Sequence, residues 1–194
     1  MSLKDEVGYL RLHSNYIGIS VLVFAGAMAA GFVAASGDPE FVSAWIKEME
    51  MLRWIMELSP PIIMLIIFFK NLLTCTLAVL LGLGLGIVPL LILISNGILL
   101  GVVSYSIINT EGALYLVAGI LPHGIIELPT VLVCTAIGLR LGSLLLHSLR
   151  KEEADLSGAT RRAFIFLLRR ATPLLFLAAM IETFITTLIL SVMV

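Results

Sequence analysis

Five polar side chains that could do chemistry stand inside otherwise apolar stretches of this chain. They are two asparagines, one histidine and two glutamates: Asn71, Asn96, His123, Glu127 and Glu182. Imidazole nitrogens and carboxylate oxygens bind zinc, iron or manganese, and the same groups relay protons or cations in transporters. The residue types therefore favour a divalent-metal site at His123, Glu127 and Glu182, a proton or cation relay, or a hydrogen-bonded network that only joins helices. Asparagine oxygens would be further metal ligands.

His123 precedes Glu127 by four residues, so both side chains would share one face of a continuous helix. Pro122 and Pro129 flank this pair, and each proline lacks a backbone N–H and frees one carbonyl of the preceding turn. We therefore predict a helix broken into two halves that meet at a His123/Glu127 site. Lys70 is included in the predicted buried polar network as a cation that can pair with the acids.

The composition indicates which elements position these residues. Of 194 residues, 60% are hydrophobic and 13% are charged, whereas a soluble domain carries about 25% charged residues. The apolar residues gather in runs near the length of about 20 that crosses a bilayer. We predict an all-α, polytopic membrane protein with a single transmembrane domain over residues 1–194. Its five predicted spans are 14–35, 62–81, 87–108, 113–139 and 173–194.

The polar residues occupy similar depths in four of these spans. A carboxylate at the bilayer centre costs about 2.5 to 3.5 kcal/mol on insertion scales. Glu127 and Glu182 should therefore turn away from lipid and converge, with Asn71 and Asn96, inside the bundle.

The distribution of charge predicts the orientation. Seven of the twelve basic residues lie in or beside the connection after the fourth span: Arg140, Arg150, Lys151, Arg161, Arg162, Arg169 and Arg170. Basic loops face the cytoplasm, so we expect a multi-pass protein of the cell membrane with its N-terminus in the cytoplasm and its C-terminus outside. A net charge of −1 excludes nucleic acid as a partner, because nucleic-acid binding needs a clustered basic excess.

The loop between the first two spans has a pattern of its own. Asp38 followed by a proline is typical of a helix start. Apolar residues then recur at spacings of three and four, at Phe41, Trp45, Met49, Leu52 and Met56. This pattern predicts a short amphipathic helix lying on the outer leaflet.

Small residues one helical turn apart occur in three pairs, Gly82/Gly86, Gly97/Gly101 and Gly138/Gly142. Such pairs let two helices approach closely. We expect most of this packing within one chain, and a homodimer or other homo-oligomer as the self-association that the same pairs would support. The lipid bilayer and other membrane proteins are the remaining expected partners.

Three motifs resemble those of the stage II sporulation protein M family of integral membrane proteins. They are Asn96-Gly97 with Gly101, Pro122-His123-Gly124 with Glu127 and Pro129, and Glu182 with Thr186. Asn71, which follows Phe68-Phe69-Lys70, is similar to the family's polar position in the second span. The resemblance covers roughly Phe68 to Thr186.

The resemblance implies a membrane scaffold, because family members in spore-forming bacteria anchor a complex that degrades cell wall during engulfment of the forespore. We therefore expect a scaffold or assembly component with a buried polar site. A metal- or proton-coupled transporter subunit is the alternative, and an intramembrane metal-dependent hydrolase is a third. An enzyme would need an open metal position and a path for water. The sequence indicates neither of these, so we do not expect an enzyme.

Overall fold

The computed structural model describes residues 3–38, 42 and 53–193, and every regular element in these residues is helical. Five helices are long and apolar enough to cross a membrane, which confirms an all-α polytopic protein. The first four are α2 (Ser14–Gly37), α4 (Pro60–Leu80), α5 (Ile87–Thr110) and α6 (Ala113–Leu149). The fifth is continuous and comprises α7 (Leu156–Phe166), η3 (Leu167–Ala171), α8 (Thr172–Met180), η4 (Ile181–Thr186) and α9 (Thr187–Met193).

Three short elements complete the described chain: α1 (Leu3–Leu12), η1 (Arg53–Glu57) and η2 (Leu81–Leu83). The 3-10 helix η1 covers the last part of the connection after α2. Most of the amphipathic helix predicted there, including its positions Phe41, Trp45, Met49 and Leu52, lies outside the described residues.

The first three long helices begin and end within two residues of the predicted spans. Tandem prolines start α4, where the missing N–H groups would have no partner in any case. A tight turn joins η2 to α5, and in it Leu85 and Gly86 adopt φ of 58° and 76°. Glycine tolerates such an angle readily, so Gly86 favours the turn, whereas Leu85 is held in a left-handed conformation that side-chain-bearing residues rarely adopt.

The predicted break in the fourth span is wrong, because α6 continues through Pro122 and Pro129 as one helix of 37 residues. Each proline removes one backbone hydrogen bond, whereas a full break in hydrocarbon would leave several polar groups without partners. The helix also passes Arg140, where the span was predicted to end, and reaches Leu149.

The fifth span was predicted to start at Pro173, but its helix starts 17 residues earlier at Leu156. Asp155 caps this start by accepting a hydrogen bond of 2.8 Å from the Gly158 backbone N–H. Pro173 lies just after the π-helical turn η3, in which the Thr172 hydroxyl donates to the Leu167 carbonyl at 2.9 Å. The wider turn accommodates the proline, so the helix does not stop there.

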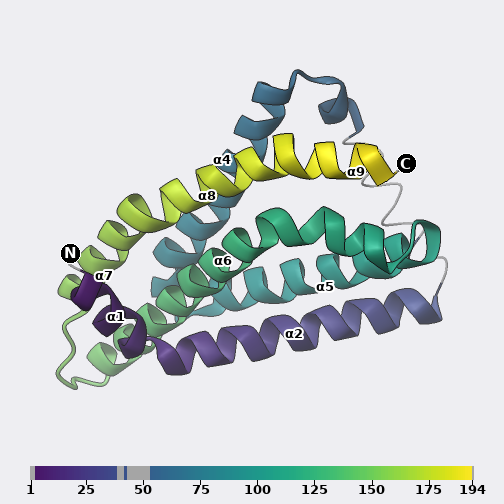
Figure 1. Cartoon of the computed structure of the whole chain (residues 1–194). Helices are drawn as coiled ribbons and strands as arrows, with labels where there is room; N and C mark the ends of the chain where they lie inside the picture. Colours follow the sequence, from purple (N-terminus) through teal and green to yellow (C-terminus); the bar gives the residue numbers. More distant parts are fainter. Residues whose placement is uncertain (1–2, 39–41, 43–52, 194) are drawn as a thin grey trace.

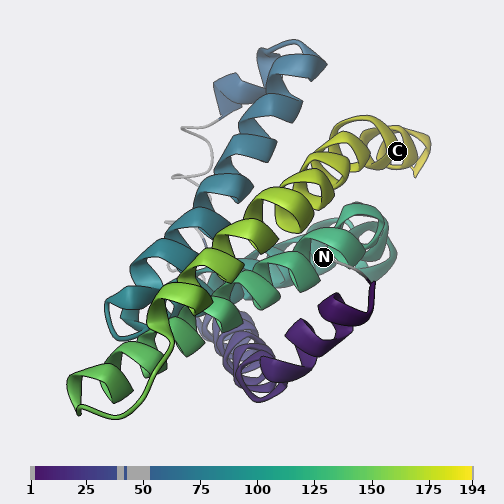
Figure 2. The same ribbon diagram turned by 90° about the vertical axis from the view of Figure 1, so that its left-hand side faces the viewer.

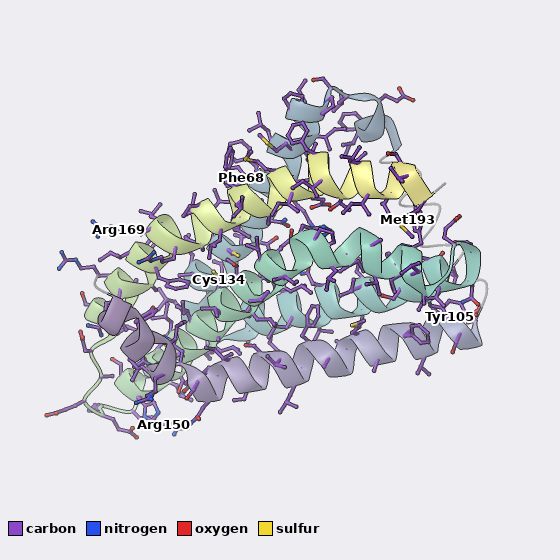
Figure 3. The ribbon with its side chains drawn as sticks, in the orientation of Figure 1. Phe68, Tyr105, Cys134, Arg150, Arg169 and Met193 are labelled. Carbon is purple, nitrogen blue, oxygen red and sulfur yellow. The ribbon has the colours of Figure 1, made fainter. Side chains whose placement is uncertain are left out.

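Figure 1 shows how the helices are arranged: the N-terminus and the connection from α6 to α7 lie at one end of the bundle, and the C-terminus lies at the other. Arg150 and Arg169 lie at the N-terminal end in Figure 3, and Tyr105 and Met193 lie at the opposite end. The C-terminal helix packs against both α4 and α6 (Figure 2).

The short helix α1 is fastened at the basic end through Tyr9. Its ring stacks on Phe166 at 5.7 Å and lies 4.4 Å from the ring of His13, between ring centroids. Burial raises the pKa of Tyr9 to about 12 and lowers the pKa of His13, whose Nδ1 contacts the Tyr9 carbonyl oxygen at 2.7 Å. Both rings are therefore neutral at pH 7.

The predicted glycine pairs lie at contacts between helices of the same chain. Gly31, Gly97 and Gly101 bring α2 and α5 into backbone contact, and a methyl group at any of them would collide with the facing helix. Gly82 and Gly138 do the same for α4 and α6. These five glycines therefore have no free face for a second copy of the chain.

A hydrophobic core forms where α4, α6 and the C-terminal helix meet. Its centre includes Cys75 of α4 and Cys134 of α6, which are fully buried and contact each other. Large apolar side chains remain exposed along the bundle, for example Leu22, Phe69 and Leu188. Such a surface suits the hydrocarbon of a bilayer.

We expect the substitution Gly138→Ala to destabilise the bundle, because the added methyl group would collide with the Ala78 carbonyl and the Pro89 ring. Overpacking of this kind costs about 1 to 3 kcal/mol. Gly26→Ala is the matched control, since nothing lies within 4 Å of the methyl position there. Thermal unfolding in detergent measures both, and equal melting temperatures would contradict the packing described.

Candidate functional site

Four membrane-spanning helices supply the predicted polar residues. Lys70 and Asn71 come from α4, Asn96 from α5, and His123 and Glu127 from α6. Glu182 comes from η4 in the C-terminal helix. The centre of the site is the triad His123, Glu127 and Glu182: one nitrogen or oxygen atom from each lies within 4.8 Å of the other two. Glu127 and Glu182 are 55 positions apart in the sequence, and the packing of the C-terminal helix against α6 brings them together.

The Glu127 carboxyl group lies at the middle of this cluster. The buried Asn71 amide is within hydrogen-bonding reach of it, and Lys70 acts on it electrostatically. One of its two oxygens, Oε2, is buried without a hydrogen-bond partner in the described part of the chain. A buried carboxylate oxygen without a partner is costly, so this atom is available to a bound cation or a proton.

His123 is oriented by a residue that sequence reasoning missed as a contact of the site. The Oγ1 atom of Thr186 lies 3.4 Å from His123 Nδ1, which leaves the other ring nitrogen to face a ligand. Metal-binding histidines are commonly fixed in this way by a second polar group. The sequence does not predict this contact, because a single threonine in an apolar span gives no indication of which side chain it meets.

Glu182 and Thr186 both lie in the π-helical turn η4. They are four residues apart, a spacing that places two side chains on one face of a helix, so both can face His123. The Thr187 hydroxyl donates to the Glu182 carbonyl at 3.4 Å and closes the wide turn. Irregular helix geometry was predicted at the prolines of α6, but the structure places it here, on the opposite side of the site.

A cavity of about 210 Å³ adjoins the triad. Its polar wall consists of Lys70, Asn96, His123 and Glu127, and its other walls are apolar residues of α2, α5 and α6. Asn96 donates its amide N–H to the Ile92 carbonyl at 2.8 Å, which fixes the side chain on the cavity wall. Asn96 therefore belongs to the cavity rather than to the triad.

The triad fits a divalent metal ion. An ion with bonds of about 2.1 Å holds its ligand atoms at most about 4.2 Å apart, so atoms already within 4.8 Å need only small side-chain rotations to close on it. One imidazole and two carboxylates suit zinc, iron or manganese. Three protein ligands leave a coordination position open, as in catalytic rather than structural zinc sites.

These features define a multi-pass α-helical membrane protein with a partly buried histidine and carboxylate cluster between its helices. The chain belongs to the Stage II sporulation protein M family, whose model matches residues 20–187. The match includes all six predicted polar residues. The comparisons with curated proteins and with solved structures give no match.

A double-mutant cycle tests the contact between α6 and η4. We expect His123→Ala and Thr186→Val, made singly and together in chelator, to show a coupling free energy of about 0.5 to 1.5 kcal/mol in unfolding, the usual contribution of one hydrogen bond. Thr110→Val, at the exposed end of α5, should show no coupling to His123. Additive effects of the first pair would contradict the contact.

Proposed function

We propose that this protein is a membrane scaffold in which a divalent metal ion ties the C-terminal helix to α6. The observation that carries the proposal is the triad itself, in which donor atoms from two helices, far apart in the sequence, lie within 4.8 Å of one another. Asn71 supports it from α4, because its amide lies within hydrogen-bonding reach of the Glu127 carboxyl from the third helix of the core. The ion would thereby join the helices that form the core of the bundle.

The metal also explains how two carboxylates, which are energetically unfavourable in hydrocarbon, can lie between the helices. Glu127 and Glu182 lie near each other, and two ionised carboxylates repel unless a cation lies between them. Lys70 reaches them electrostatically but makes no ion pair within 4.0 Å in the described part of the chain. A divalent ion at the triad would neutralise both carboxylates at once.

Metal analysis tests this proposal directly. Protein purified without chelator should hold one divalent ion per chain, and the double substitution His123→Ala, Glu127→Gln should abolish this content. Glu111→Gln is the matched control, because Glu111 is an exposed carboxylate at the end of α5. A full metal content in the double variant, or none in the unaltered protein, would refute the metal site.

A metal that binds only the folded chain must also stabilise it. At a free metal concentration of about 100 times the dissociation constant, the gain is about 2.7 kcal/mol. We therefore expect chelator to lower the melting temperature of the unaltered protein and of Glu111→Gln, but not that of the double variant.

Movement of the metal or of protons across the membrane is a second candidate, and the cavity beside the triad favours it. Flux into proteoliposomes separates it from the scaffold. A transporter would carry metal or protons down an imposed gradient, with loss of the flux in Glu127→Gln and Glu182→Gln. A scaffold would hold its ion with no flux.

For the orientation, we propose that the basic end lies in the cytoplasm, with the N-terminus, and that the C-terminus lies outside. The support is the group of arginines at one end of the bundle, together with the positive-inside rule. Cysteine substitutions test it on intact cells with a membrane-impermeant maleimide. Glu111→Cys should be labelled and Glu153→Cys should react only after lysis; the reverse pattern would invert the topology.

A further inference from the structure

The cavity beside the triad has two chemically different parts, and this contrast indicates its ligand. Lys70, Asn96, His123 and Glu127 provide the polar wall. The remaining wall is apolar and comes from three helices: Phe24, Leu99, Leu100, Val103, Ile120 and Leu128. A small polar solute would make no favourable contact with the apolar wall, whereas an amphiphile would contact both walls.

The charge of the cluster indicates the sign of the polar group. Given the metal of the proposed function, on which this inference rests, two carboxylates and a divalent ion are neutral together. The Lys70 ammonium then adds one positive charge, and Lys70 makes no ion pair within 4.0 Å in the part of the chain that the structure describes. An uncompensated charge beside hydrocarbon is unfavourable, so one monoanionic group is required. It would meet both the open metal position and Lys70.

The size and opening of the cavity indicate where the rest of the ligand lies. A volume of about 210 Å³ holds a head group but no complete lipid. Lys70 lines the cavity and is also exposed, so the cavity opens at this residue. The neighbouring side chains Phe69 and Leu73 are exposed to 59% and 58% and would lie along an acyl chain.

We propose that the cavity binds the monoanionic head group of a membrane lipid, a phosphodiester or a carboxylate, with the anion bridging Lys70 and the metal at the triad. Lys70 lies at the middle of α4, so the head group would lie deep in the membrane, where Lys70 and the metal replace the water that it gives up. The acyl chain leaves past Phe69 and Leu73 into the bilayer. The lipid would thus supply the fourth ligand of the metal.

Manganese-loaded full-length protein in phosphatidylcholine nanodiscs tests this proposal, with a minor fraction of phosphatidylglycerol in one arm and of carboxyl-labelled oleate in the other. Bound manganese broadens the magnetic resonance signals of nearby nuclei. We expect broadening of the phosphorus signal of phosphatidylglycerol or of the carboxyl signal of oleate, which identifies the head group. Native mass spectrometry should show one such lipid retained per chain.

Lys70→Gln should reduce lipid retention about tenfold or more, because it removes the charge that meets the anion, while the metal content stays at one ion per chain. Lys70→Arg should restore retention and serves as the check on folding. Arg169→Gln, at the basic end of the bundle and away from the cavity, is the matched control and should retain the lipid.

The outcomes separate this inference from the proposed function. A normal metal content with no retained lipid, or with equal retention in Lys70→Gln, overturns the lipid site and leaves the metal site standing. Displacement of the lipid by acetate or inorganic phosphate at equal concentration overturns the lipid as occupant, because a free anion would then serve as well. Absence of metal from the unaltered protein refutes the proposed function, and with it the bridge.

Discussion

The placement of two carboxyl groups between membrane-spanning helices is the constraint on which the rest of this structure depends. Hydrocarbon supplies no hydrogen bonds, so Glu127 and Glu182 must be met by protein groups or by a bound ion. Each of the helices around them contributes to this requirement: α4 brings Asn71 and Lys70, α6 brings His123, and η4 brings Thr186. A partly buried polar cluster therefore lies between the same helices that form the hydrophobic core, and the surface around it is apolar.

Such a cluster forms only where the helices can be brought close together, and the glycines make that approach possible. Gly138 of α6 lies against the backbone of α4, and Gly101 of α5 lies against the backbone of α2. In a bilayer the hydrophobic effect does not drive helices together, so backbone contact and hydrogen bonds must do so. The glycine contacts thus hold α4 against α6, and the same pair of helices carries Asn71 and Glu127.

Much of this architecture could be predicted from the sequence because membrane spans and buried charges leave strong signals. The class of the protein, the first three long helices and the convergence of His123, Glu127 and Glu182 follow from hydrophobic run length and from the cost of a charge in lipid. The irregular helix could not be predicted. Pro122 removes one backbone hydrogen bond. Whether the helix breaks there depends on whether other parts of the chain can bond the backbone groups that a break would free. Nothing local to Glu182 signals a π-helical turn.

The position of that turn has a physical reason. A π-helical turn gives up regular α-helical bonding, and this loss is acceptable where it improves another contact. At η4 the Thr187 hydroxyl bonds the Glu182 carbonyl across the wide turn, and the Thr186 hydroxyl contacts His123. In the turn η3 the Thr172 hydroxyl likewise bonds the carbonyl five residues earlier, that of Leu167, but this turn accommodates Pro173. One π-helical turn thus accommodates a proline, and the other lies where the C-terminal helix presents a second carboxylate to the unbroken helix α6.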